Sequence, residues 1–240
     1  MTLALENKPE TNAHEFNRIL ESFSVGRSCS EASDYKFING NLIHKLAVIN
    51  WDLLEIGVGN IIGPFVCIGT AAQHKYLPSN GKIKIGDFNT IRECSTVHLP
   101  TDPSIGTIIG NNNFIMASAH INHDCILEDN IIMCNNAALA GHVRVMNGAY
   151  LSLNSSVHQF QVIGSWSIIG MNSCVTRLLD VEPGFKYAGT PAKKMKINYL
   201  GLQRNRITET ELELAKQNFW NYRKPPINPT NLTKDRGVVG

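Results

Sequence analysis

Three side chains that can move protons lie close together in the stretch MASAHINHDCILEDN, residues 116–130. They are His120, His123 and Asp124. A histidine can act as a general base near neutral pH, and a nearby carboxylate can orient its ring and stabilise the imidazolium that forms. The stretch therefore predicts general base catalysis, provided that the fold presents these side chains to a substrate.

A second stretch, LAGH, ends in Gly141 and His142. A backbone N–H such as that of Gly141 can stabilise a developing oxyanion. If Gly141 and His142 lie beside His123 and Asp124, the combined residues can deprotonate a nucleophile and stabilise the carbonyl that it attacks. Taken singly, each of these residues can equally be an exposed turn residue, so the elements that position them decide the question.

A six-residue rhythm of apolar residues runs through both stretches. Counting by six from Ile109 to Val175, all twelve positions are Ile, Leu, Met or Val. The residue four places after an anchor is usually small, as at Ala119, Cys125, Ala137, Ala149, Ser155, Ser167 and Ser173. The same rhythm occurs earlier, at Ile56, Ile62, Ile68, Ile85, Ile91 and Val97.

A period of six fits neither an α-helix nor a simple strand alternation. Hexapeptide repeats produce it, because each repeat forms one short strand and a turn, and three repeats build one triangular coil of a parallel β-helix. The large residue fills the prism and the small one fits the tighter corner. The handedness does not follow from the period, since crossovers are usually right-handed. It is taken from the resemblance to hexapeptide proteins, which are left-handed.

The predicted fold is an all-β solenoid, a left-handed parallel β-helix over residues 38–186. An N-terminal segment, 1–37, contains a short helix at 14–23. A C-terminal helical region and tail cover 187–240, with a helix that starts at a capping box from Thr208 to Glu211 and ends before Pro225 and Pro226. Two stretches, 70–82 and 99–104, interrupt the rhythm and are predicted to be loops that leave the prism.

The coil stacks the two chemical stretches, because residues three repeats apart face each other in neighbouring coils. His142 then lies one coil from Asp124, and Gly141 lies one coil from His123. The ionisable residues are predicted to form one patch on the outer wall of the prism.

Composition indicates an ordinary soluble protein. Charged residues make up 18% of the 240 residues and the net charge is +2, which does not favour nucleic acid as a partner. No apolar run is long enough for a transmembrane helix, and the first residues lack the pattern of a signal peptide. The six cysteines follow no disulfide or metal-binding spacing, so we expect reduced thiols and a cytoplasmic location.

Several motifs together resemble the UDP-N-acetylglucosamine acyltransferases that begin lipid A synthesis. They are SAHINHDC, NNAALAGHV and SSVHQF, with KIKIGDFNTIRECSTVH before them and INYLGLQRNRIT after them. The resemblance covers the chain from about Ile56 to Thr208. It implies a homotrimer with active sites between subunits, and direct acyl transfer from acyl carrier protein to a hydroxyl of the nucleotide sugar, with no metal and no tightly bound cofactor.

The resemblance also implies roles for individual residues in the acyl transfer reaction. His123 is the base that deprotonates the acceptor, Asp124 orients it, and the Gly141 amide binds the thioester oxyanion. His120 and His142 line the cleft.

Other residues are implied to bind the substrates. His158 and Gln159 contact the donor arm and the nucleotide sugar, while Asn198 and Arg204 hold the sugar nucleotide, with Arg204 reaching its phosphates. Lys75 contributes from a loop. For His158, Lys75 and Arg204 the alternative is an ordinary wall or surface residue.

The family sets acyl length with a residue just after the IIG of the coil that follows VHQF. Long chains need a glycine there, and this sequence has Met171. The expectation is an acyl chain shorter than the fourteen-carbon type, and the alternative is that Met171 only packs between coils.

Four departures from the family pattern affect the surroundings of the sugar and the donor. Leu99 replaces a basic residue, Leu200 replaces an acidic one, His74 replaces a loop acid, and the C-terminal helical region is short. The stretch AGTPAKK, 188–194, also resembles the coil exit of hexapeptide acetyltransferases that use coenzyme A.

Three alternative functions stay open at this point. One is an N-acyltransferase that acts on an amino-sugar nucleotide with an acyl carrier protein or coenzyme A donor. Another is a zinc hydro-lyase, in which three histidines from neighbouring subunits hold the metal, but His120 and His123 are spaced three apart rather than five. The last is a scaffold without catalysis, which gives no reason for the whole set of motifs.

Overall fold

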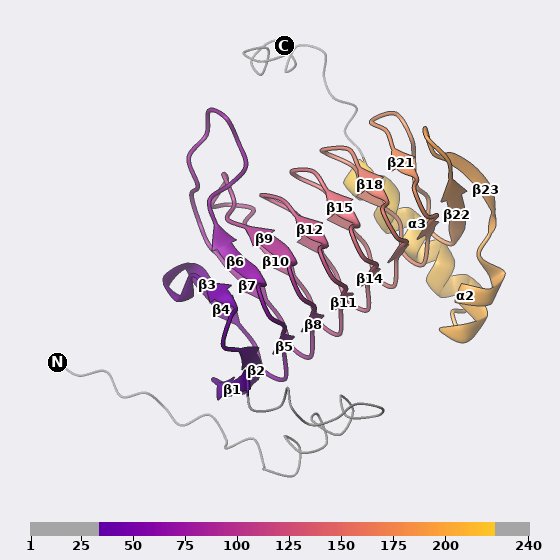
Figure 1. The fold of residues 1–240 in the computed structure, drawn as a ribbon. Coiled ribbons are helices and arrows are strands. Elements are labelled where there is room, and N and C mark those ends of the chain that lie inside the picture. The colour runs from indigo at the N-terminus through magenta and orange to yellow at the C-terminus, as the bar shows by residue number, and fades with distance from the viewer. Residues whose placement is uncertain (1–33, 224–240) are drawn as a thin grey trace.

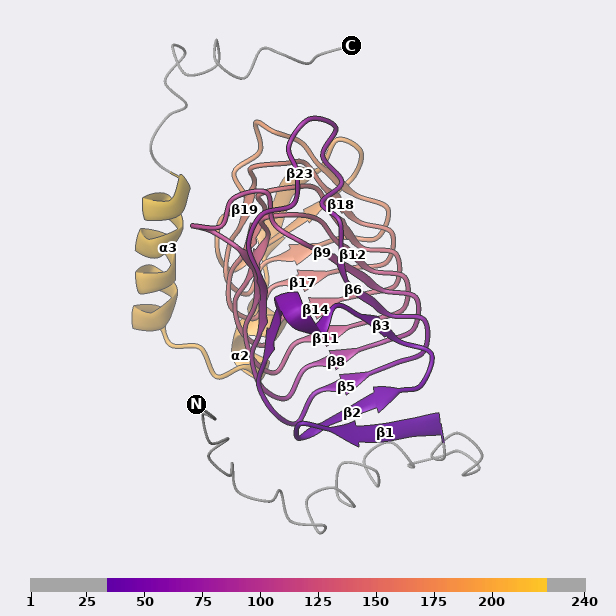
Figure 2. The same ribbon diagram turned by 90° about the vertical axis from the view of Figure 1, so that its left-hand side faces the viewer.

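The computed structural model of the protein describes residues 34–223. Its short strands stack as the coils of a left-handed parallel β-helix, seen from the side in Figure 1 and along the axis in Figure 2. The helix expected at 14–23 and the prolines expected to end the last helix lie outside the described residues.

The three walls of the prism are three sheets, each built from strands of successive coils. The ten-stranded sheet has the order β1 (Tyr35–Ile38), β2 (Asn41–His44), β5 (Ile61–Ile62), β8 (Thr90–Ile91), β11 (Phe114–Ile115), β14 (Ile132–Met133), β17 (Tyr150–Leu151), β20 (Ile168–Ile169), β22 (Phe185–Ala188) and β23 (Lys193–Ile197). The seven-stranded sheet consists of β3 (Val48–Ile49), β6 (Cys67–Thr70), β9 (Thr96–His98), β12 (His120–Ile121), β15 (Ala138–Leu139), β18 (Ser156–Val157) and β21 (Cys174–Val175). The six-stranded sheet consists of β4 (Leu54–Ile56), β7 (Ile83–Ile85), β10 (Thr107–Ile109), β13 (Ile126–Leu127), β16 (Arg144–Val145) and β19 (Val162–Ile163).

The six-residue anchors form the core, as the rhythm predicts. All twelve anchors from Ile109 to Val175 are buried, with at most 3% of each residue exposed. The small residues four places later are buried as well, which confirms that they fit the corners of the coil. Burial of these apolar side chains is the main favourable term that holds the coils together.

The register between coils follows the predicted spacing wherever no loop intervenes. Ile115 pairs with Met133, the anchor three repeats further along the chain. The step along the chain is longer from Ile91 to its partner Ile115, and longer still from Ile62 to its partner Ile91. These longer steps contain the loops at 99–104 and 70–82, so both loops leave the prism as expected while the strands keep their stacking.

Antiparallel strands close the two ends of the prism. At the N-terminal end β1 pairs with β2, and at the other end β23 pairs with β22. The C-terminal region therefore contains strand β23 in addition to helices α2 (Tyr199–Arg204) and α3 (Glu209–Arg223). A short 3₁₀ helix, η2 (Trp51–Leu53), lies between β3 and β4.

Helix α3 packs on the outside of the six-stranded sheet (Figure 2). Its Phe219 is buried against Met146 and Val162. The predicted capping box starts it, because Thr208 and Glu211 exchange hydrogen bonds between side chains and backbone amides. Within residues 34–223, no helix combines the length and the apolar character needed to cross a membrane.

Candidate active site

Two stacked turns carry the central residues. The turn after β12 holds His123 and Asp124, and the turn after β15 holds Gly141 and His142. Because β12 and β15 pair in register, the turns lie one above the other, and the His142 amide donates to the His123 carbonyl oxygen at 3.0 Å. The predicted patch of ionisable residues is therefore present.

The backbone of each turn favours particular residue types at its second position. Asp124 has a φ of 59° and His142 a φ of 60°, both in the left-handed region. Asparagine, aspartate and histidine enter this region more readily than most side chains. Aspartate and histidine can thus occupy these corners at little backbone cost.

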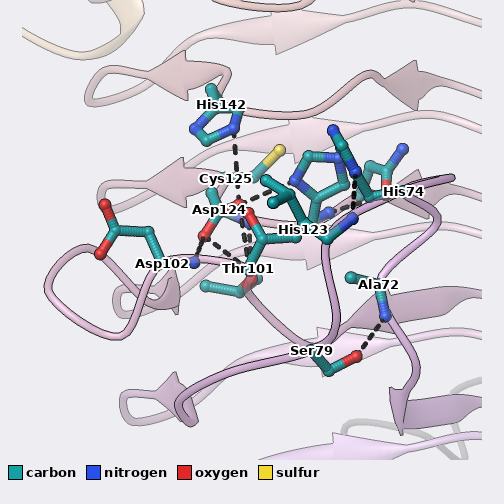
Figure 3. A network of polar contacts seen from close by, with 12 residues as sticks. Ala72, His74, Ser79, Thr101, Asp102, His123, Asp124, Cys125 and His142 are labelled. Atoms are coloured by element: carbon teal, nitrogen blue, oxygen red, sulfur yellow. Dashed lines mark hydrogen bonds and ion pairs between the residues drawn. The ribbon is translucent and has the colours of Figure 1, made fainter. Parts of the chain in front are cut away.

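His123 and Asp124 form a hydrogen-bonded dyad (Figure 3). The Nδ1 atom of His123 lies 2.7 Å from Oδ2 of Asp124, and both residues are buried. When Nδ1 carries the proton and donates to the carboxylate, Nε2 is left as the acceptor. That arrangement is the one a general base needs, because the free nitrogen takes a proton while the carboxylate stabilises the resulting charge.

The loop at 99–104 holds the carboxylate of Asp124. The Thr101 hydroxyl donates to Oδ2 at 2.7 Å, and the amides of Thr101 and Asp102 donate to Oδ1 at 3.0 Å each. Burial tends to raise the pKa of Asp124, but these hydrogen bonds and that to His123 outweigh it and hold the pKa below its ordinary value. Asp124 is therefore an ionised carboxylate at neutral pH.

His142 completes the patch above Asp124. Its Nε2 lies 3.5 Å from Oδ2 of Asp124, and its ring stacks on Phe160 with 4.5 Å between centroids and 9° between planes. Burial lowers the pKa of His142, while the neighbouring Asp124 carboxylate acts in the opposite direction. The net lowering favours a neutral ring that can offer one donor and one acceptor.

Gly141 lies directly against the ring of His123. A Cβ atom placed on Gly141 would come within 2.4 Å of Cε1 and 2.7 Å of Nε2 of that ring. Among the described residues the Gly141 amide has no acceptor, so it is available to a substrate oxygen. A glycine is needed at this position because only hydrogen fits beside the base.

His120 lies on β12, in front of the turn. Its Nδ1 is 2.8 Å from the Thr96 hydroxyl, and its ring centroid is 5.0 Å from that of His98. Burial, and then the proximity of His98, lower the pKa of His120.

Comparison with known proteins places this architecture among acyltransferases. The model of the family described as bacterial transferase hexapeptide (six repeats) matches residues 106–141. An acyl-acyl-carrier-protein–UDP-N-acetylglucosamine O-acyltransferase from Gloeothece citriformis is 40% identical over 166 residues, which cover 69% of this chain and 59% of that protein. The protein of the same name from Herminiimonas arsenicoxydans is 41% identical, with 68% of this chain and 62% of that protein covered.

Two solved structures agree with the sequence matches. The UDP-N-acetylglucosamine acyltransferase of Bacteroides fragilis aligns with a TM-score of 0.66 and 29% identity over 84% of this chain and 79% of that chain. The enzyme of that name from Arabidopsis aligns with a TM-score of 0.60 and 30% identity over 74% of this chain and 80% of that chain. The chain belongs to the UDP-N-acetylglucosamine acyltransferase family. It spans about three fifths of the length of the curated relatives.

The remaining residues that the resemblance assigns to substrate binding are spread along the prism. His158 and Gln159 occupy the turn after β18, one coil beyond Gly141, and both are exposed. Lys75 lies exposed in the loop at 70–82, with its Nζ 5.1 Å from the ring centroid of Tyr76. None of the three contacts the dyad directly among the described residues, so their binding roles stay predictions.

Asn198 and Arg204 lie at the far end of the prism, on either end of α2. The Asn198 side chain accepts from the Gly201 amide at 3.2 Å and donates to the Trp166 carbonyl at 3.0 Å, so within this chain it caps the helix. Arg204 is exposed. Roles for Asn198 and Arg204 toward a nucleotide stay predictions.

Met171 is 64% exposed at a turn after β20, so its side chain projects outward rather than between coils.

The sequence reasoning missed the residues that support the dyad. Thr101 and Asp102 hold Asp124, Phe160 stacks on His142, and the His74 ring meets the His123 ring at 5.5 Å between centroids. The six-residue count gives no signal for Thr101, because the loop at 99–104 interrupts it. None exists for His74 either, which stood out only as a departure from the family pattern.

His123, Asp124 and His142 also offer three ligand atoms that lie within 4.8 Å of one another. They do not match the set of three histidines that the hypothesis of a zinc hydro-lyase requires. In addition, both Asp124 oxygens already accept hydrogen bonds from Thr101, and Oδ1 also accepts one from the Asp102 amide. The arrangement of donors therefore fits proton transfer better than metal binding.

Proposed function

We propose that the protein transfers an acyl group, of the 3-hydroxyacyl class, from the thioester of acyl carrier protein to a hydroxyl of UDP-N-acetylglucosamine. The curated relatives and the solved structures bear names that describe this reaction. The step belongs to lipid A or related cell-surface glycan synthesis. The same names favour O-acylation over the N-acylation of an amino-sugar nucleotide.

The His123–Asp124 dyad is the observation that carries the proposal. Nε2 of His123 takes the proton of the acceptor hydroxyl as its oxygen attacks the thioester carbonyl carbon. Asp124 stabilises the imidazolium that results, and the Gly141 amide donates to the oxyanion of the tetrahedral intermediate. When the intermediate collapses, the carbon–sulfur bond breaks and His123 returns the proton to the departing thiolate. No metal and no covalent enzyme intermediate is required.

The other predicted residues place the substrates around this dyad. His142 and His120 line the cleft, and His158 and Gln159 on the next turn contact the donor arm and the nucleotide sugar. Lys75 contributes from its loop.

We further propose a homotrimer with active sites between subunits. Asn198 and Arg204 lie on the same chain as the dyad but make no contact with it, and a neighbouring copy brings such residues to the site. A cytoplasmic location accords with the cysteines among residues 34–223, all of which are free thiols.

A product screen by mass spectrometry tests the reaction. UDP-N-acetylglucosamine and amino-sugar nucleotides are each offered with 3-hydroxyacyl carrier proteins and with short acyl coenzyme A donors. We expect acylated UDP-N-acetylglucosamine, formed from the carrier protein donor. Product from an amino sugar alone would replace the proposal with N-acylation.

A pair of variants tests the mechanism. His123→Ala should lower turnover by roughly 10²- to 10⁴-fold, the usual contribution of a general base. Lys216→Gln on α3 changes a residue that pairs with Glu213 and has no contact with the dyad, so it should leave turnover unchanged. A folded His123→Ala protein that keeps near-normal turnover contradicts the mechanism.

A further inference from the structure

A cleft of about 400 Å³ lies between helix α3 and the prism. One side of it consists of the turns after β13, β16 and β19, strands of the six-stranded sheet, and the other side is one face of α3. The dyad lies instead on turns after strands of the seven-stranded sheet. Among the described residues, none that lines the cleft makes a hydrogen bond or ring contact with His123 or Asp124. The cleft is therefore a separate place on the molecule, and its size suits a small molecule.

Several contacts hold α3 against the prism beside the cleft. The guanidinium of Arg144 lies 4.0 Å from the ring centroid of Tyr222, and Nε of Arg223 donates to Oδ1 of Asp180 at 2.6 Å. The side chain of Phe219 is fully buried. Because the helix is already fixed, a ligand can bind in the cleft without first ordering it.

The cleft contains polar groups that the described part of the protein leaves unused. Ser165 is only 2% exposed, yet its hydroxyl has no hydrogen-bond partner among the described residues. The side-chain amide of Asn218 on α3 has no such partner there either. Glu211 accepts from Thr208 with Oε2, which leaves Oε1 without a partner in this part of the chain. Since a buried hydroxyl without a partner costs free energy, a ligand that bonds to Ser165 recovers it.

The charges around the cleft favour a neutral ligand. None of the described residues that line it is Lys, Arg or His, so an anion such as a phosphate meets only carboxylates. Glu128 is already neutralised, because Nη1 of Arg144 lies 3.0 Å from its Oε1 and the Asn147 side chain donates to its Oε2 at 2.9 Å. A cation would find one available carboxylate, the exposed one of Glu211.

Aromatic side chains narrow the class of ligand further. Trp166 and Tyr222 both line the cleft, and the indole of Trp166 packs closely on Gly148 of the turn one coil earlier. The cleft therefore offers aromatic surface next to a hydroxyl, an amide and a carboxylate. A sugar ring matches this combination, because its C–H groups are apolar and its hydroxyl groups both donate and accept.

We propose that the cleft binds a neutral saccharide, whose hydroxyl groups take the hydrogen bonds that Ser165, Asn218 and Glu211 leave unused. The sugar ring packs against Trp166. Binding here requires neither the dyad nor an acyl donor, so the inference goes beyond the proposed function and does not rest on it.

Two matched pairs of variants test the site. Ser165→Ala removes a hydroxyl of the cleft, whereas Ser167→Ala removes one that is buried outside it and has no partner among the described residues either. Ala149 occupies the place of residue 167 one coil earlier, so alanine fits there. On α3, Asn218→Ala removes an amide of the cleft, and Gln217→Ala changes the exposed residue next to it, outside the cleft.

The readout is the dissociation constant from NMR titration with methyl glucoside, methyl galactoside and methyl N-acetylglucosaminide. We expect at least one of them to bind. Ser165→Ala and Asn218→Ala should each weaken that binding by roughly 3- to 10-fold, the net value of one hydrogen bond, while Ser167→Ala and Gln217→Ala bind as wild type does. No binding of any of the three sugars at about 10 mM, or equal losses within a pair, overturns the proposal.

Charged sugars and a competitor complete the test. The ammonium form of glucosamine and glucose 6-phosphate should bind no more tightly than the methyl glycosides, and tighter binding of either overturns the assignment to a neutral ligand. Saturating UDP-N-acetylglucosamine should not displace the methyl glycoside, and His123→Ala should bind it as wild type does. Displacement places the sugar at the dyad and overturns the cleft as its site. A protein without acyltransferase activity would refute the proposed function and leave these binding results standing.

Discussion

The close fit of Gly141 against His123 leads to a prediction that can be worked out from distances. In Gly141→Ala the added Cβ would lie 2.4 Å from Cε1 of the His123 ring. Carbon atoms in ordinary contact are separated by about 3.5 Å, so the ring must move by about 1 Å. His123 is only 6% exposed and is bound to Asp124 at 2.7 Å, so the movement disturbs that hydrogen bond.

A displacement of this size should be costly for catalysis. Misplacing a catalytic group by about 1 Å can cost about 10²-fold in rate. The backbone amide of residue 141 remains in the variant, so the loss reports on the base rather than on the oxyanion donor. We expect kcat for acyl transfer to fall by about 10²-fold, and the thermal unfolding midpoint to fall as well, because overpacking a buried site typically costs about 1–3 kcal/mol.

A double-mutant cycle tests the reasoning. If residue 141 acts through the ring, Gly141→Ala should cost nothing further in a His123→Ala background. Gly170→Ala controls for the steric cost alone, because its added Cβ would also crowd a neighbour, 3.1 Å from Cβ of Ala188, at a position after β20 and not beside the dyad. Wild-type turnover in Gly141→Ala, or the same loss in both backgrounds, would refute the steric argument.

Two further predictions concern pH and acyl length. Burial lowers the pKa values of His120 and His142 in the folded protein. Below about pH 6.5 the unfolded chain therefore binds more protons than the folded chain, and the free energy of unfolding decreases as the pH falls. The urea midpoint should therefore be lower at pH 5 than at pH 7.5, with a smaller difference in His142→Gln, and a midpoint independent of pH would contradict this. Met171 is 64% exposed and should exclude long acyl chains. Wild type should therefore prefer ten-carbon to fourteen-carbon donors in competition, and Met171→Gly should shift the preference toward longer chains. Equal use of both donors by wild type would rule out this role.

The prism and the central patch could be predicted from the sequence. The six-residue period is a local property, because each coil repeats the same choice of a large core residue and a small corner residue. Once three repeats make one coil, the stacking of His142 over Asp124 and of Gly141 over His123 follows by counting. The handedness and the roles of the individual residues came from the resemblance to a family and not from the period.

Only the tertiary structure decided what surrounds that patch. The loops at 70–82 and 99–104 break the count, and no repeat dictates where their side chains point. Their contacts, Thr101 with Asp124 and His74 with His123, depend on how the two loops pack on each other. The period therefore determined where the base is, while the loop packing determined what holds it and which ring lies beside it.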